Sequence, residues 1–338
     1  MANTEKSKQE KFDRDALHLN AAEETQKIVA SLQQVVHQRL RKRGAVVGIS
    51  GGIDSSVTLA LCTRAFGAQN VLGVIMPEKE SHPESQSIAI RLAERMQVPV
   101  VTEELTSALE SLGCYRRRDD AIRSLFPDFG KDWKSKITLP GNLLENNTFN
   151  IFTLTVVSPT TEDKESQTYS KRLPLKEYLQ IVAASNLKQR LRMATLYFHA
   201  ERSNYAVIGT ANKNERELGF FVKYGDGGVD VSPITHLFKT QVFQLAEYLD
   251  IPREIQQRIP TTDTYSAGST QEEFFFRLPF ELLDTIWFGY EHGYSSQEIA
   301  SALGLSDGQV VRVIADIERK KRTTSYLREI PIQISDTF

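Results

Sequence analysis

Residues 45–56 are Ala-Val-Val-Gly-Ile-Ser-Gly-Gly-Ile-Asp-Ser-Ser, and this stretch decides the predicted fold. Its first part, Ala45–Ile49, is an apolar run of the kind found in buried parallel strands. Gly51 and Gly52 let the backbone turn tightly beside a ligand, because glycine has no Cβ. The apolar spacing of Val57–Phe66 then predicts a helix. Such a strand, turn and helix N-terminus direct backbone N–H groups at one point, which suits a phosphate or pyrophosphate.

The side chains of this loop restrict its chemistry. No Gly-Lys-Ser or Gly-Lys-Thr ending follows the glycines, so γ-phosphate transfer of the Walker type is not expected. Asp54 places a carboxylate beside the anion site, and a divalent cation between the two would account for it. The alternative is an ordinary strand–turn–helix unit whose glycines serve close packing, and the order Ser-Gly-Gly-Ile-Asp-Ser argues against it.

Strand and helix patterns alternate outside this stretch. Short apolar runs predict further strands, and amphipathic spacing predicts further helices. The alternation predicts an α/β fold with a doubly wound, Rossmann-like parallel sheet. Ligands of such sheets bind beyond the carboxyl ends of the strands, where the glycine loop lies. The predicted strands span 71–76, 98–102 and 205–209, and the predicted helices span 20–43, 84–96 and 187–202, the last with Asn186 as its N-cap.

Residues 113–180 interrupt this alternation. They include a basic start at Cys114–Arg118, a strand-like run at Phe149–Val157 and a polar stretch at Thr160–Arg172 that predicts a loop. We expect an inserted flap with some β-structure over the site, and a surface decoration or subunit contact is the alternative. The expected division is a disordered or loosely ordered leader over 1–19, an α/β domain with the insertion over 20–276, and a C-terminal helical extension over 277–338.

The composition is that of an ordinary globular protein. The 338 residues are 40% hydrophobic and 25% charged, and the formal net charge of −2 gives no general attraction to nucleic acid or anionic membranes. No apolar run reaches the ~20 residues of a membrane span, and Met1–Asp15 lacks the apolar core of a secretory signal. Cys62 and Cys114 do not form a C-x-x-C pair, so we expect a cytoplasmic protein without disulfides.

Two further segments carry groups suited to a phosphate site. Thr210 and Glu215 follow the predicted strand at 205–209. Glu215 can supply a second carboxylate for Mg²⁺, which takes one or two carboxylates together with phosphates and water. Lys239 stands at the start of an apolar helix, where its charge could meet a phosphate.

The segment 220–230, Phe-Phe-Val-Lys-Tyr-Gly-Asp-Gly-Gly-Val-Asp, is typical of a ligand-binding loop, with a glycine-rich turn as the alternative. Arg190 lies near the predicted start of its helix and could contact an anionic ligand, whereas a solvated helix face is the other interpretation. Thr261 adds a small hydroxyl in a turn after Pro260.

These motifs resemble the NAD synthetases, a family within the N-type ATP pyrophosphatases. The resemblance covers about residues 20–110 and 180–265. It is carried by Ser50–Ser55, Asn186–Met193, Gly209–Glu215, Gly219–Asp230, Lys239–Gln241 and Pro260–Thr261. The Lys-Tyr-Gly-Asp-Gly-Gly stretch within it is more specific to the family than the glycine loop.

The resemblance implies a role for each matching residue. It implies ATP contacts at Gly48, Ile49, Ser50, Gly51, Gly52, Ile53, Asp54, Ser55, Thr210, Lys239 and Thr261. Asp54 and Lys239 would be the catalytic residues, and Asp54 and Glu215 would bind Mg²⁺. Deamido-NAD would contact Arg190, Lys223 and Asp230, with Lys320 and Lys321 as weaker candidates. The family fold is usually a homodimer with the dinucleotide near the subunit interface.

The implied reaction is the ATP-dependent amidation of deamido-NAD. A carboxylate is a poor acyl electrophile, so it first attacks the α-phosphorus of ATP, giving an acyl-adenylate and pyrophosphate. Ammonia then displaces AMP. This chemistry needs electrostatic stabilisation more than acid–base groups, so no catalytic His or Cys is required. The chain is too short for an added glutaminase domain, so we expect free ammonia or ammonia from a separate protein.

Two departures from the family pattern leave other acceptors open. Gln271 stands where the family commonly has an acid, and Arg116–Arg118 of the insertion could contact an anionic acceptor. An ATP-dependent amide ligase acting on a different carboxylate is therefore the alternative. A minor alternative is a DNA-binding regulator, because residues 295–322 have the pattern of a helix-turn-helix with a basic end.

Overall fold

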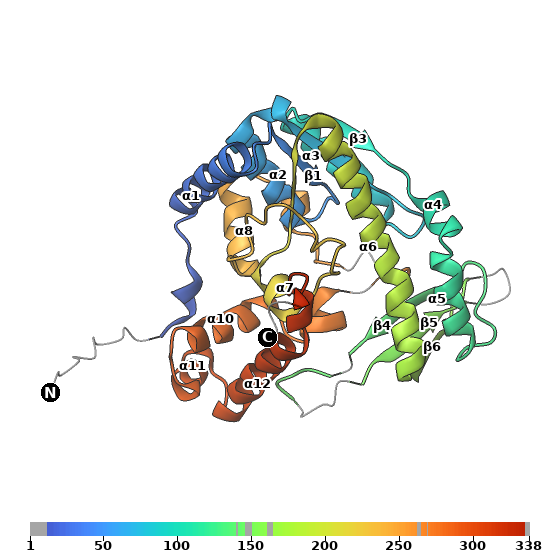
Figure 1. Ribbon diagram of the computed structural model, residues 1–338. Helices are drawn as coiled ribbons and strands as arrows, with labels where there is room; N and C mark the ends of the chain where they lie inside the picture. Colours follow the sequence, from blue (N-terminus) through green and yellow to red (C-terminus); the bar gives the residue numbers. More distant parts are fainter. Residues whose placement is uncertain are drawn as a thin grey trace.

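The computed structural model describes residues 12–139, 141–145, 151–160, 165–261, 265–268 and 270–334. Its centre is a parallel four-stranded sheet with the order β3–β2–β1–β7 (Figure 1). The strands are β1 (Ala45–Gly48), β2 (Val71–Ile75), β3 (Val100–Thr102) and β7 (Ala206–Ile208). Each predicted strand is confirmed and shortened by one or two residues at an end. Because β1 pairs with both β2 and β7, the glycine loop that follows it begins in the middle of the sheet.

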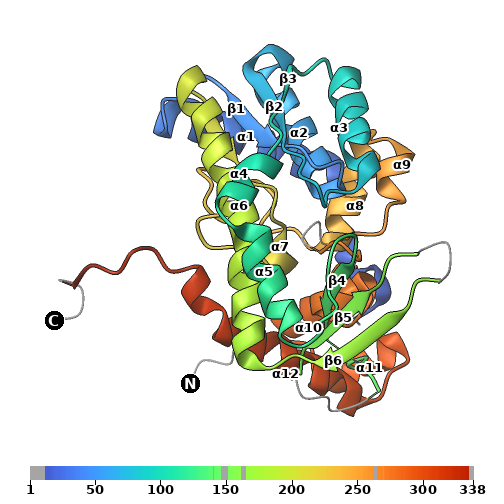
Figure 2. The ribbon, with the colours of Figure 1, turned by 90° about the vertical axis from the view of Figure 1, so that its right-hand side faces the viewer.

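Helices cover both faces of this sheet (Figure 2). In β1, Val46 packs with Met193 and Leu196 of the long helix α6, while Ala45 and Val47 pack into the core on the opposite face. Both faces of the strand are thus apolar, as in other buried parallel sheets. The predicted doubly wound α/β fold is confirmed. The helices of the two layers are α1 (Ala21–Gln33), α2 (Ile53–Phe66), α3 (Pro83–Arg95) and α8 (Lys239–Tyr248) on one face and α6 (Leu175–Ser203) on the other.

Two helices begin earlier than their apolar spacing indicates. α2 begins at Ile53, because extended Gly52 acts as its N-cap and the polar residues after it fit the exposed first turn. α6 begins at Leu175, directly after Pro174, and not at residue 187. The prediction that Asn186 caps this helix is wrong, because Asn186 lies inside it. The predicted helix 20–43 is α1 followed by a π-helical segment at Gln34–Arg39.

The insertion forms a helix and a separate antiparallel sheet with the order β4–β5–β6. The predicted loop at Thr160–Arg172 is partly wrong, because residues 168–172 form the edge strand β6. All five of its residues are exposed, so β6 lacks the alternating apolar pattern that marks a half-buried strand. Part of the predicted strand 149–157 lies outside the described residues. The elements before and within the insertion are α4 (Thr106–Ser111), α5 (Cys114–Arg123), β4 (Lys134–Thr138), β5 (Thr153–Val157) and β6 (Thr168–Arg172).

The C-terminal helices enclose a second apolar core around Trp287 and Phe276. Phe12 and Leu17 are buried in this core, so the part of the expected leader within the described ranges is packed against the helices. α11 and α12 are joined by a short turn, as predicted for residues 295–322. Among the described helices, none has both the length and the apolar character needed to cross a membrane. The remaining helices are α7 (Lys213–Leu218), α9 (Arg253–Gln256), α10 (Phe280–Glu291), α11 (Ser296–Leu303) and α12 (Asp307–Thr323).

Candidate active site

A cavity of about 710 Å³ opens beyond the carboxyl ends of β1, β2 and β7. One part of its wall is the glycine loop, and another part comes from α6 and the insertion. Of the predicted ATP residues, all but Gly51 line this cavity. Those that line it are Gly48, Ile49, Ser50, Gly52, Ile53, Asp54, Ser55, Thr210, Lys239 and Thr261.

Gly51 has a conformational role in the loop. Its φ is +76°, which residues with a Cβ rarely adopt, and a Cβ would lie 2.8 Å from the carbonyl oxygen of Ser85. Glycine is therefore required here both for the turn and for close packing against α3. The turn presents the N-terminus of α2 to the cavity, where free N–H groups and the helix dipole favour an anion.

Asp54 and Lys239 meet at this end of the cavity. Asp54 lies in the first turn of α2, and Lys239 is the first residue of α8. The two side chains form an ion pair, and Asn212 Nδ2 donates to Asp54 Oδ1 at 3.0 Å. The Lys239 side chain is almost completely buried, so its charge acts where solvent screening is weak.

Glu215 lies next to this pair at the start of α7. Its Oε2 accepts from the Asn212 N–H at 3.2 Å, and its Oε1 accepts from Gln271 Nε2 at 3.2 Å. Burial, and then the nearby Asp54 carboxylate, raise the pKa of Glu215 to about 8. Two neighbouring carboxylates in a partly desolvated cavity favour a cation between them.

The donor set at this point fits Mg²⁺, which prefers oxygen ligands and retains water. Asp54 and Glu215 supply carboxylate oxygens, and the buried Gln271 Oε1 has no hydrogen-bond partner within the described part of the chain. No cluster of three or more His, Cys, Asp or Glu residues suited to a metal occurs among the described residues. The remaining ligands would come from phosphate and water.

A buried polar cluster fixes the start of α8, which carries Lys239. Asn214 Oδ1 accepts from the Lys239 N–H at 2.9 Å, and Asp284 Oδ2 accepts from the N–H of Thr240 at 2.9 Å. These side chains replace a conventional cap, since the N-cap residue Phe238 has no side-chain acceptor. Burial raises the pKa of Asp284 from 3.8 to about 6.

This shift predicts an unusual pH dependence of stability. The folded-state pKa of Asp284 lies above its unfolded value, so the folded protein binds the proton more tightly and the cost of the buried charge is largest above pH 6. Relative to Asp284→Asn, the unfolding free energy of the wild type should rise by about 1 kcal/mol from pH 7 to pH 5. Urea unfolding of both proteins at the two pH values measures this difference. A difference that stays constant, or that falls toward pH 5, would contradict the assignment.

Another part of the cavity wall is aromatic. Phe152 of the insertion stacks on Tyr178 of α6 with ring centroids 4.4 Å apart, and both line the cavity. Tyr265 and Phe274 lie on the same wall with their rings 5.3 Å apart. The insertion therefore contributes to the cavity, as expected of a flap. Such a wall suits a flat, uncharged part of a ligand.

The predicted deamido-NAD residues do not line this cavity. Arg190 is exposed and donates to the carbonyl of Lys223 at 3.3 Å. Lys223 Nζ donates to the carbonyls of Tyr326 and Glu329 at 2.9 and 2.8 Å. Asp230 accepts from the Tyr197 hydroxyl and from the Val207 N–H. In this single chain these groups bind other parts of the protein.

The two weaker candidates, Lys320 and Lys321, also face protein groups. Lys320 is buried and lies 2.8 Å from Asp316, and Nζ donates to the Phe275 carbonyl at 2.7 Å. Burial lowers the pKa of Lys320 to about 8. Lys321 lies 3.8 Å from both Glu217 and Glu291.

Four charged residues line the cavity although the sequence did not indicate them: Glu78, Arg192, Asp226 and Arg258. Arg192 lies two residues beyond Arg190 on α6, and Asp226 lies in the glycine-rich segment four residues before Asp230. Burial raises the pKa of Asp226 to about 6. Arg258 Nη1 donates to the Gly51 carbonyl at 3.5 Å, and its Nη2 lies 3.4 Å from both His82 Nδ1 and Ser85 Oγ. The charged motifs marked the correct segments, and helix rotation and loop shape decided which member faces the cavity.

A parallel sheet with a glycine loop beside two carboxylates and a buried lysine places the chain among the α/β proteins of the ATP pyrophosphatase fold. A solved NMN synthetase from Francisella tularensis shares this fold, with a TM-score of 0.62 and 22% sequence identity over 93% of this chain and 98% of that one.

The NAD synthase family model matches residues 24–123 and 142–331. The NH(3)-dependent NAD(+) synthetase of Mesorhizobium japonicum is 48% identical over 316 residues, which are 94% of this chain and 97% of that protein. The enzyme of the same name from Rhizobium meliloti is also 48% identical, over 94% of this chain and 92% of that protein. The chain belongs to the NAD synthase family.

Proposed function

We propose that this chain is an ammonia-dependent NAD synthetase that converts deamido-NAD, ATP and ammonia to NAD, AMP and pyrophosphate. The observation that carries the proposal is a single cavity lined both by Asp54, Glu215 and Lys239 and by an aromatic wall. The charged residues suit the triphosphate, and the aromatic wall suits the pyridine ring of an acceptor whose carboxylate reaches the α-phosphorus. Relatives at 48% identity support this choice of substrates.

Different residues have different roles in the first step, the attack of the carboxylate on ATP. The glycine loop and the start of α2 hold the phosphates through backbone N–H groups. Lys239 stabilises the negative charge that develops on the departing pyrophosphate, and Asn212 and Lys239 orient Asp54. Asp54 and Glu215 would hold Mg²⁺, which neutralises phosphate charge when bound. Thr210 and Thr261 add hydroxyl contacts to the nucleotide.

We further propose that the acceptor site is completed in a homodimer. Arg190, Lys223 and Asp230, which the family resemblance assigns to deamido-NAD, lie outside the cavity of one chain. α6 also exposes Leu175, Leu179 and Phe198, a distribution that favours association with a second copy. Light scattering after size exclusion should give twice the mass of one chain. A monomer that is fully active would contradict this arrangement.

The proposal also includes a compartment and a nitrogen source. Cys62 and Cys114 are both free and buried, as suits a protein of the reducing cytoplasm. Free ammonia, or ammonia from a separate protein, would be the nitrogen source. Ammonium chloride should therefore support turnover, whereas glutamine added to the purified chain should not.

The acceptor is tested by measuring pyrophosphate release from ATP with ammonium and a panel of carboxylates. Deamido-NAD should give NAD, AMP and pyrophosphate in equal amounts, and the other acids should give turnover lower by about 100-fold or more. Pyrophosphate release with another acid alone would make the chain an amide ligase of the same fold with a different substrate. If none of the acids gives pyrophosphate, the proposal that the chain is an enzyme is wrong.

The alternative of a DNA-binding regulator is not favoured. Arg319 and Lys320 in α12 pair with Asp316, and Arg312 donates to the carbonyls of Leu143 and Leu144. These basic groups thus face protein partners, which reduces the attraction of this segment to phosphate. We expect no mobility shift of duplex DNA at low salt, and a salt-dependent shift would reopen this alternative.

A further inference from the structure

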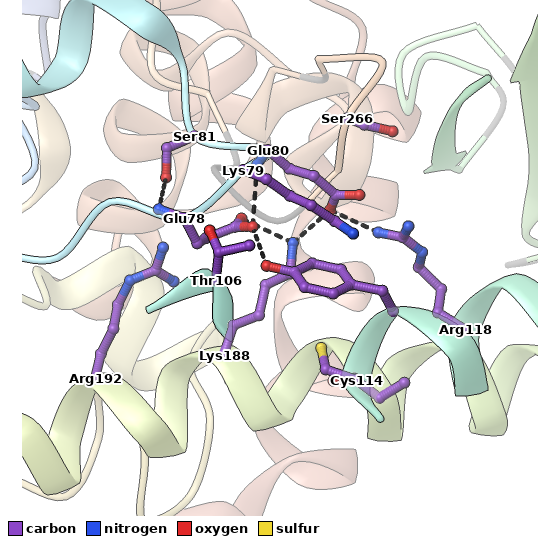
Figure 3. A network of polar contacts seen from close by, with 12 residues as sticks. Glu78, Lys79, Glu80, Ser81, Thr106, Cys114, Arg118, Lys188, Arg192 and Ser266 are labelled. Carbon is purple, nitrogen blue, oxygen red and sulfur yellow. Dashed lines mark hydrogen bonds and ion pairs between the residues drawn. The ribbon is translucent and has the colours of Figure 1, made fainter. Parts of the chain in front are cut away.

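A second group of buried charges lies beside the cavity and takes no part in the steps above (Figure 3). We call it the Glu78 cluster, and its members are Glu78, Glu80, Tyr115, Arg118 and Lys188. The side chains of Glu78, Lys188, Arg118 and Glu80 are only 0%, 2%, 6% and 10% exposed. Because Arg118 is buried here, the expectation that it contacts an anionic acceptor is wrong.

Lys188 is at the centre of the cluster. Its Nζ lies 2.9 Å from Glu78 Oε1 and 2.6 Å from Glu80 Oε2. Arg118 Nη1 lies 2.6 Å from the same Glu80 oxygen, and the Tyr115 hydroxyl donates to Glu78 Oε2 at 2.6 Å. The cluster thus joins α6, the insertion helix α5 and the loop that follows β2.

The same contacts shape that loop, residues 76–82. Glu78 Oε2 also accepts from the Glu80 N–H at 3.0 Å. The Glu78 N–H donates to Ser81 Oγ at 3.0 Å, and the Ser81 N–H donates back to the Glu78 carbonyl at 2.9 Å. The loop is therefore a closed turn, and its position relative to α5 and α6 depends on the cluster.

The same loop forms part of the cavity wall. Pro77, Glu78, Ser81 and His82 line the cavity together with the glycine loop. Arg258 bridges the two walls, because its Nη1 donates to the Gly51 carbonyl and its Nη2 lies 3.4 Å from His82 Nδ1. The cluster thus holds a loop that lines the same cavity as the predicted triphosphate site.

Stability alone does not account for the cluster. Burying charges costs desolvation energy, and well-packed apolar side chains of similar volume often do as well or better. A charged cluster instead offers directional contacts that select one loop geometry.

We propose that Lys188 and Glu78 are positioning residues for ATP: they hold the loop at 76–82 in the shape that completes the nucleotide site and join this shape to the insertion. The proposal rests on ATP binding in this cavity, as in the proposed function, and is independent of the identity of the acceptor.

Lys188→Met removes the central charge while keeping a similar side-chain length. Because it also leaves buried carboxylates uncompensated, the charge-balanced double variant Glu78→Gln/Lys188→Met is measured beside it. Lys176→Met, at an exposed position of the same helix, is the matched control. Thermal melting first establishes which variants are folded.

The dissociation constant for ATP is measured by calorimetry without an acceptor. If the competent loop shape falls to about a tenth of the population, this constant should rise about tenfold in the folded variants. Turnover at saturating ATP should stay near the wild-type value, and Lys176→Met should change neither quantity. Tryptic cleavage after Lys79, whose side chain is 42% exposed, should become faster in the Lys188 variants and slow again with saturating ATP.

A folded Lys188 variant with an ATP dissociation constant within about twofold of wild type and unchanged cleavage at Lys79 would overturn the proposal. If Lys188→Met does not fold, the double variant decides by the same criteria. If neither the single nor the double variant folds, the proposal is also overturned, because the cluster would then be needed for folding of the whole protein. If the wild type binds ATP but amidates another acid, the deamido-NAD assignment is wrong. The proposed role of Lys188 and Glu78 in ATP binding is not affected by that result.

Discussion

Replacing Asp54 by Asn is expected to lower turnover about 1000-fold or more. Asp54 lies at the meeting point of the glycine loop, Lys239 and Asn212, and it is one of the two carboxylates proposed to hold Mg²⁺. Asn keeps the shape and one acceptor but removes the charge that a cation and Lys239 require. The measurement is pyrophosphate release from ATP in the presence of deamido-NAD and ammonium.

Asp250→Asn serves as the control for this variant. Asp250 is an exposed carboxylate with a φ of +57°, a conformation that Asn also tolerates, so its replacement should leave turnover unchanged. An Asp54→Asn protein that melts like wild type and keeps most of its activity would contradict the role of Asp54. Restored activity of Asp54→Asn at high Mg²⁺ would place the defect in metal binding.

Replacing Lys239 by Met is expected to lower kcat about 100- to 1000-fold. The ammonium group is almost completely buried beside the proposed triphosphate site, where a fixed charge would stabilise the pyrophosphate leaving group more strongly than it would in water. Because this charge develops in the transition state, kcat should fall more than the ATP affinity.

Steady-state kinetics with varied ATP separates these two effects. Lys27→Met, which removes a solvent-exposed pair with Glu23, is the matched control and should change neither constant. A Lys239→Met protein whose ATP affinity is lost while kcat is retained would show that Lys239 binds the ground state only.

The phosphate end of the site could be predicted from the sequence because it depends on backbone geometry. A strand, a glycine turn and a helix start, as at residues 45–56, usually form a strand–turn–helix unit. Ligands of parallel sheets bind beyond the carboxyl ends of the strands, where this turn lies. Thr210 and Glu215 follow the strand that pairs with β1, so their approach to Asp54 follows from the order of the sheet. Lys239 was predicted from its position at a helix N-terminus, and it lines the cavity beside Asp54.

The charged residues that line the rest of the cavity could not be predicted in the same way, because they depend on side-chain direction. α6 begins twelve residues before the predicted start. Successive residues of a helix are rotated by about 100° around its axis, so side chains two positions apart point in different directions. Arg192 consequently faces the cavity while Arg190 faces away. Lys320 was a weaker candidate for contact with deamido-NAD, but it is buried and contacts Asp316 one turn earlier and the Phe275 carbonyl.

The insertion was the hardest segment to predict because its contacts are long-range. The exposed edge strand β6 has no apolar face, and the stacking of Phe152 on Tyr178 joins the flap to α6. Local patterns do not reveal such pairings. Likewise, Glu78 and Lys188 are 110 residues apart, and nothing in either local sequence marks them as partners.

The transfer of oxygen from acceptor to AMP tests the central claim most directly. Deamido-NAD labelled with ¹⁸O in its carboxylate is converted with ATP and ammonium, and the products are analysed by mass spectrometry. Attack of the carboxylate on the α-phosphorus predicts one labelled oxygen in AMP and none in pyrophosphate. Label in inorganic phosphate, with ADP as the nucleotide product, would mean activation through an acyl phosphate and would contradict the account of this site.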